Sequence, residues 1–164
     1  MRLLLALLGL PLLIGPVPRA VAPVSGWDWP LPLPHHVERG FDPPPQPWLP
    51  GHRGVDLTGT VGETVLAAGD GVVSFAGRVA RVPVLSIRHP DGLLTTYQPV
   101  RSRLRAGDPV RLGQPIGRLV EAGSHCAARA CLHWGLRRGV DYLDPLSLLH
   151  LNPVRLLPLV SDRQ

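Results

Sequence analysis

The sequence predicts an all-β protein: an antiparallel β sandwich or barrel-like domain that ends in a short helix. Two observations carry this prediction. Glycine (18 residues) and proline (20 residues) are abundant among the 164 residues, whereas aromatic residues make up only 5%, a balance typical of short strands and frequent turns. Short strand-like segments also recur from residue 55 onward, with glycine turns and no long helical pattern between them.

Residues 1–22 carry the pattern of an export signal. Arg2 supplies a positive start, and the apolar run that follows is interrupted by Pro11 and Gly15. The run is too short and too broken to predict a membrane span, so an uncleaved signal would be the only membrane attachment. We therefore expect a secreted or cell-envelope protein.

Residues 23–50 are predicted to form an extended arm that is laid over the domain of residues 51–150, with residues 151–164 as a C-terminal tail. Proline is too frequent in the arm for a helix, and it leaves few N–H donors for a sheet. Fixing the arm to the core is the expected role of its tryptophans, with sugar stacking as the alternative. These tryptophans are Trp27, Trp29 and Trp48.

The strand-like segments follow one another along the domain. Two pairs of them flank Asp70-Gly71 and Pro90-Asp91-Gly92, which are hairpin-type turn sequences, so each pair is predicted to be antiparallel. A closing helix over residues 146–150 is predicted from Asp144 as its N-cap and Pro145 in its first turn. The predicted strands cover residues 63–68, 72–77, 82–89, 93–97, 107–113, 114–120 and 131–137.

The charge of the chain comes from arginine alone. Seventeen arginines and no lysine stand against twelve acidic residues, which gives a formal net charge of +5. This charge suits an anionic setting such as a cell wall or a membrane surface, although genome composition would explain arginine usage equally well. No basic cluster is interleaved with aromatic residues, so nucleic acid is not predicted as a partner.

Residues 51–57, Gly-His-Arg-Gly-Val-Asp-Leu, contain the first half of a candidate zinc site. In an extended segment, His52 and Asp56 point to the same side, because they are an even number of residues apart. Zinc accepts an imidazole and a carboxylate, and His133 in a later strand is the candidate third ligand. A His and an Asp at this spacing also arise by chance, so the pair alone is a weak signal.

Cys126 and Cys131 are close enough in sequence to close a small loop. In an oxidising compartment a disulfide is the favoured state of such a pair. The alternatives are free thiols or Cys131 as a thiolate ligand of the metal. The distinction matters because a disulfide sulfur cannot serve as a thiolate ligand.

Five blocks of residues, in order, resemble the lysostaphin-like, LytM-type zinc metallopeptidases. The resemblance extends from about residue 50 to residue 147. It implies the antiparallel fold known as the duplicated hybrid motif, zinc held by His52, Asp56 and His133, and cleavage of peptide cross-links in bacterial peptidoglycan. The blocks are residues 51–57, 61–73, 88–97, 107–117 and 132–136.

Two positions depart from the pattern of this family. Its Y-x-H segment ends in proline here, at Pro99, and the first histidine of its H-x-H is replaced by Cys131, so both usual catalytic histidines are missing. Neither a proline nor a disulfide-bonded cysteine transfers a proton. His125 is the candidate replacement acid or base, and Tyr97 is a candidate hydrogen-bond donor to a developing oxyanion.

The sequence therefore leaves two alternative functions. The first is a slow zinc metalloendopeptidase, because the loss of a general acid or base costs roughly 10²- to 10⁴-fold in rate. The second is a noncatalytic zinc-containing module that binds peptidoglycan or regulates another envelope hydrolase. The retained ligands favour the enzyme, or at least a zinc protein. A β domain without a metal would require the ordered blocks to have arisen by chance.

Overall fold

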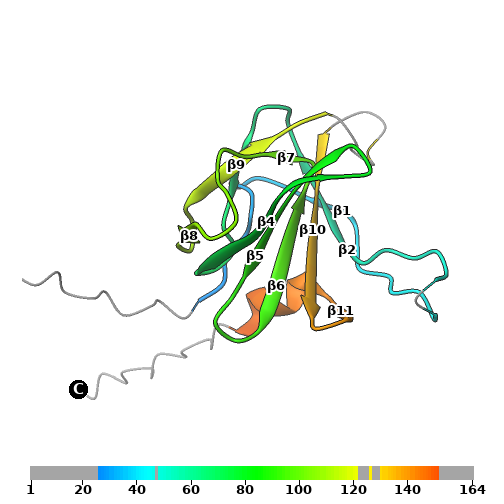
Figure 1. The fold of residues 1–164 in the computed structure, drawn as a ribbon. Coiled ribbons are helices and arrows are strands. Elements are labelled where there is room, and N and C mark those ends of the chain that lie inside the picture. The colour runs from blue at the N-terminus through cyan, green and yellow to red at the C-terminus, as the bar shows by residue number, and fades with distance from the viewer. Residues whose placement is uncertain (1–25, 47, 122–125, 127–129, 152–164) are drawn as a thin grey trace, which may run out of the picture.

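The computed structural model describes residues 26–46, 48–121, 126 and 130–151, and it confirms the antiparallel β architecture (Figure 1). The predicted closing helix is present among them as a 3₁₀-helix, η1 (Pro145–Leu151), and Asp144 Oδ1 accepts a hydrogen bond from the backbone N–H of Leu146. The strands are β1 (Val37–Arg39), β2 (Gly54–Gly59), β3 (Thr64–Leu66), β4 (Gly71–Val79), β5 (Val82–Arg88), β6 (Leu93–Gln98), β7 (Val100–Arg101), β8 (Pro109–Val110), β9 (Pro115–Leu119), β10 (Ala130–Arg138) and β11 (Asp141–Leu143).

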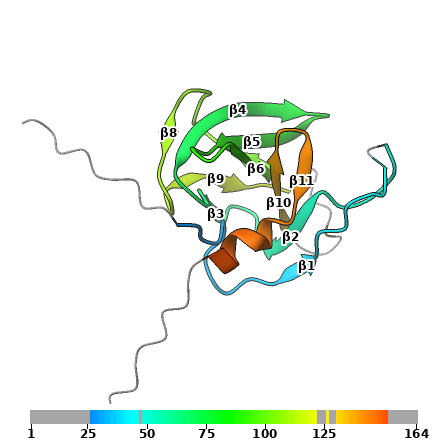
Figure 2. The same ribbon diagram turned by 90° about the horizontal axis from the view of Figure 1, so that it is seen from below.

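The strands form two sheets. The larger one has the order β1-β2-β10-β6-β5-β4-β8, with β11 paired to β10, and the smaller one has the order β3-β9-β7. Figure 2 shows the larger sheet curving around β3 and β9. The hydrophobic core fills the space that this curvature encloses, and the opposite face of the larger sheet is left for a site.

Side chains of the larger sheet point alternately to its two faces, the core and the outer face. In β10, Leu132 and Trp134 are fully buried in the core. Because successive side chains of a strand point to opposite faces, His133 and Gly135 lie on the outer face. Tyr97, the register partner of Trp134 on β6, is also buried in the core.

One predicted hairpin is confirmed and the other is wrong. β5 and β6 pair antiparallel across the turn that contains Gly92, whose φ of +80° suits glycine. β3 and β4, however, belong to different sheets, so Asp70-Gly71 is a crossover rather than a hairpin turn. Asp70 Oδ1 accepts a hydrogen bond from the N–H of Leu112 there. A Cβ on Gly71 would lie 2.5 Å from the carbonyl oxygen of Arg88, so the glycine permits a close backbone approach.

The described part of the arm, residues 26–46 and 48–50, runs along the domain and adds β1 to the edge of the larger sheet. Trp27 packs on the ring of His89, with 4.6 Å between the ring centroids. The ring centroids of Trp29 and Trp134 are 6.5 Å apart. Trp48 is 79% exposed. The expectation that all three tryptophans fix the arm to the core is therefore wrong for Trp48, which lies in the loop between β1 and β2 that leaves the sheet (Figure 1).

The predicted disulfide between Cys126 and Cys131 is present, with 5.8 Å between the Cα atoms. The predicted export signal, His125 and the tail beyond residue 151 lie outside the described residues. Within the part of the chain that the structure describes, no helix has the length and apolar character needed to cross a bilayer.

A buried polar network links β5 and β6 to the crossover. The His89 Nδ1–H donates to the carbonyl oxygen of Asp70 at 2.8 Å, and His89 Nε2 lies 2.8 Å from Thr95 Oγ1. Thr95 Oγ1 lies 2.9 Å from the hydroxyl of Tyr97, which also accepts from the N–H of Ala68. Burial lowers the pKa of His89, and the carbonyl of Asp70 opposes that shift only in part.

This lowered pKa predicts how stability depends on pH. The unfolded chain takes up a proton at His89 near pH 6.5, whereas the folded protein takes it up only at lower pH, so the free energy of unfolding falls as the pH decreases below 6.5. His89→Gln is expected to flatten this dependence, which for one proton is at most about 1.4 kcal/mol per pH unit. Urea unfolding at several pH values measures it. His36→Gln, on the exposed arm, is the control, and equal slopes for wild type and His89→Gln would contradict the prediction.

Candidate metal centre

The structure brings the three candidate ligands together where β2 and β10 pair. Asp56 on β2 pairs directly with His133 on β10, and His52 lies two residues before the start of β2. Asp56 Oδ1 lies 3.1 Å from His52 Nε2 and 2.8 Å from His133 Nδ1, and the two histidine nitrogens are 3.1 Å apart. A group of two imidazoles and one carboxylate therefore converges on a single point.

The arm holds His52 in place. The backbone N–H and carbonyl of His52 both bond with the backbone of Asp42, as an isolated antiparallel bridge. The His52 Nδ1–H donates to the carbonyl oxygen of Gly40 at 2.6 Å, so Nε2 is the ring nitrogen that faces Asp56. An outer hydrogen bond of this kind fixes the tautomer and orientation of histidines that bind metals.

The side chain of Asp56 is only 3% exposed. Burial by itself raises the pKa of Asp56, but hydrogen bonds and positive charge from His133 and then His52 outweigh burial, so the pKa lies below its usual value. The group is therefore a carboxylate at neutral pH, as a metal ligand must be.

The donor set fits zinc. Ligand atoms at about 2.1 Å from a tetrahedral zinc ion are about 3.4 Å from one another. The observed separations of 2.8 to 3.1 Å need to widen by about 0.3 to 0.6 Å. Two nitrogens, one oxygen and a position open to solvent are typical of catalytic rather than structural zinc sites.

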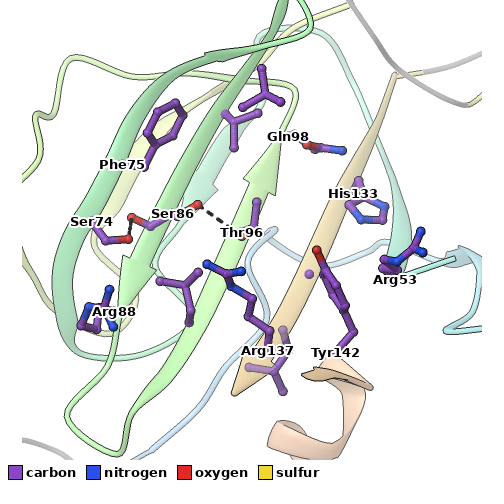
Figure 3. Close-up of a pocket in the computed structure, with 15 residues that line it drawn as sticks. Arg53, Ser74, Phe75, Ser86, Arg88, Thr96, Gln98, His133, Arg137 and Tyr142 are labelled. Atoms are coloured by element: carbon purple, nitrogen blue, oxygen red, sulfur yellow. Dashed lines mark hydrogen bonds between the residues drawn. The ribbon is translucent and has the colours of Figure 1, made fainter. Parts of the chain in front are cut away.

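An open groove of about 570 Å³ lies on the outer face of the larger sheet and reaches the cluster at His133. The His133 side chain is 14% exposed, whereas the other two ligands are almost fully buried, so His133 forms the boundary between cluster and groove. Figure 3 shows the groove, with Tyr142 and Gln98 on either side of the approach to His133. Two hydroxyls lie in the groove among apolar side chains: Ser86 Oγ and Thr96 Oγ1 are 3.2 Å apart.

The candidate catalytic residues do not assemble in the same way. Tyr97 faces the core, and burial raises its pKa to about 12, so the expectation that its hydroxyl serves the groove is wrong. Tyr97 and Gln98 are consecutive residues of β6, so their side chains point to opposite faces of the sheet. Gln98 pairs with His133 and lines the groove, which leaves Tyr97 in the core. Pro99 is buried, and Cys131 is held in the disulfide.

Sequence reasoning missed two kinds of residue at this site. The carbonyl acceptor Gly40 has no residue-type signature, because any residue offers a backbone oxygen. Arg88 and Arg137 line the groove, and strand alternation could have placed Arg137 there, since it lies an even number of residues after His133 on β10.

Comparison with known proteins places these features in a family. Residues 50–145 match the model of Peptidase family M23. The uncharacterized protein Rv2891 of Mycobacterium tuberculosis is 47% identical over 154 residues, which cover 92% of this chain and 61% of that relative. The chain thus spans less than two thirds of the length of this relative.

More distant proteins share the domain. Murein hydrolase activator NlpD of Salmonella dublin is 30% identical over 131 residues, 78% of this chain and 32% of that protein. A zinc containing peptidase from Vibrio cholerae shares the fold with a TM-score of 0.62 and 22% identity, over 72% of this chain and 38% of that one. The family match covers more than half of the sequence, and this chain therefore belongs to peptidase family M23.

Proposed function

We propose that this protein is a secreted zinc metalloendopeptidase that cuts peptide cross-links in bacterial peptidoglycan. The observation that carries the proposal is the converged set of His52, Asp56 and His133 at the end of an open groove. Membership of a peptidase family supports the reaction class, and the relative named as a murein hydrolase activator supports a cell-wall setting. The predicted export signal at residues 1–22 agrees with that location.

In this proposal, the three ligands hold zinc and the groove holds the peptide. Zinc, when bound, polarises a peptide carbonyl and lowers the pKa of a water molecule toward neutrality. Gln98, opposite His133 in the β6–β10 register, is placed to donate from its side-chain amide to the peptide near the ligands. The hydroxyls of Ser86 and Thr96 offer further hydrogen bonds along the groove floor.

We expect the reaction to be slow. Pro99 and Cys131 occupy the positions at which the family usually has proton-transferring histidines, and neither can replace them. The loss of one general acid or base costs roughly 10²- to 10⁴-fold. His125 remains a proposed substitute, tied by sequence to the disulfide that ends on the strand of His133.

Release of peptide fragments from purified peptidoglycan tests the function. The exported protein with its disulfide intact is incubated with zinc, and fragments are identified by mass spectrometry. We expect slow release by wild type and release at the enzyme-free level by His133→Ala, because that variant loses a ligand. Equal release by both proteins would overturn the zinc mechanism. His125→Ala then tests whether that side chain moves the proton.

The absence of the usual histidines at Pro99 and Cys131 favours a second candidate function, that of a noncatalytic module that retains zinc. Such a module would bind peptidoglycan through the groove or regulate another envelope hydrolase, which is the activity that the Salmonella relative is named for. The fragment assay separates the two candidates. Binding of the polymer by wild type without any release would exclude the enzyme and leave the module.

A further inference from the structure

The outer face of the larger sheet is organised in rows that run across the strands. Register pairs place Gln98 beside His133 in the row that contains the metal cluster. Two residues further along the strands, Ser86, Thr96 and Gly135 form a polar row. A third row lies two residues beyond the second: in it, Leu94 on β6 pairs with Arg88 on β5 and with Arg137 on β10. These residues share one face, because each row is two residues from the next.

The far row carries positive charge that no described acidic side chain in the groove balances. Arg88 and Arg137 both line the groove, whereas neither Asp nor Glu is among its described lining residues. Within the described part of the chain, no carboxylate forms an ion pair with either guanidinium. Figure 3 shows Arg137 reaching over the floor toward Thr96, and Arg88 on the opposite side. The groove therefore has the metal cluster with Arg53 beside it at one end, and Arg88 and Arg137 on either side of Leu94 toward the other.

The spacing between these ends can be expressed in peptide residues. His133 and Arg137 are four residues apart on β10, or about 13 Å along the strand at about 3.3 Å per residue. An extended peptide in the groove has the same rise per residue. Because the Arg137 side chain reaches back toward Thr96, a group of the peptide that meets the two arginines lies about two to four residues from the bond held at the cluster.

We propose that Arg88 and Arg137 form a subsite for a carboxylate of the peptide, so that the groove selects anionic peptides with a free carboxylate about two to four residues from the bond at the metal cluster. Arginine fits this role because its planar guanidinium donates two parallel hydrogen bonds to a carboxylate. The polar row between the two ends binds the intervening backbone. This inference names the substrate class of the groove and rests on the proposed function.

The test compares peptides that differ only in charge. Soluble muropeptides are prepared with lysozyme from purified peptidoglycan, and the carboxylates of one half are converted to amides with carbodiimide and ammonia. Affinity of the exported protein for both preparations is measured by calorimetry. We expect wild type to bind the unmodified form about tenfold more tightly, the scale of one charge-assisted hydrogen-bonded pair. Arg137→Gln and Arg88→Gln should each remove most of that difference.

Arg138→Gln is the matched control, since Arg138 is the next residue of β10, points to the other face and does not line the groove. It removes the same net charge and should keep the tenfold preference. Equal affinity of wild type for both preparations would overturn the subsite while leaving the proposed function intact, provided that fragments are still released. Binding of neither preparation would overturn it as well, and without fragment release the proposed function would fail with it.

Discussion

Asp56→Asn is expected to abolish zinc binding at ordinary zinc concentrations while the domain stays folded. The substitution keeps the shape of the side chain but removes the only carboxylate of the cluster. Loss of an outer hydrogen-bond partner of a metal ligand already costs 10- to 100-fold in affinity, so loss of a ligand should cost more than 100-fold. The amide of Asn can still bond with the two imidazoles, which limits the damage to the apoprotein.

Thermal unfolding with and without zinc measures this effect. At a zinc concentration of about 1,000 times the wild-type Kd, wild type gains about 4 kcal/mol, whereas a variant with 100-fold weaker binding gains about 1.4 kcal/mol or less. Asp141→Asn, an exposed carboxylate on β11 outside the cluster, should respond to zinc as wild type does. A zinc-dependent rise in Tm that Asp56→Asn leaves unchanged would show that the metal binds elsewhere.

Gly54→Ala is expected to destabilise the protein by about 2 to 3 kcal/mol and to weaken zinc binding at the same time. A Cβ at Gly54 would lie 2.5 Å from the carbonyl oxygen of Trp134 and 2.7 Å from His133 Nε2. The carbonyl belongs to β10 and cannot move without disturbing its pairing with β2, so the overlap is overpacking of a rigid site. The ring of His133 would have to turn away from Asp56.

Gly135→Ala is the matched control for this prediction. Gly135 is the register partner of Gly54, and a Cβ there would meet its nearest atom at 3.6 Å, an ordinary van der Waals distance. We expect a change of less than about 1 kcal/mol and unaltered zinc binding. Urea unfolding and zinc titration of both variants make the comparison. If the two glycines tolerate alanine equally well, the close approach of Gly54 to the His133 ring is not what positions that ligand.

Much of the candidate site could be predicted because strand alternation is a local property. The spacing of His52 and Asp56 already predicts that they face the same way, and β10 was predicted as the strand that carries His133. The turn before Leu93 could also be predicted from the sequence, because it needs a residue with positive φ and Gly92 supplies it. These features depend on neighbours in sequence, so the residues themselves specify them.

Other features depend on partners that are distant in sequence. Asp70-Gly71 has the residues of a hairpin turn, but the smaller sheet takes β3 away from β4, and only the full set of strand pairings decides this. Whether Tyr97 or Gln98 faces the groove depends on which face of β6 is buried, and that is decided by the segments packed against the sheet. The sequence by itself therefore determined most of the strands and the three candidate ligands, and it favoured the disulfide. Tertiary structure decided what surrounds them: the carbonyl of Gly40 behind His52 and the arginine row across the groove, because these are contacts between segments that fold onto one another.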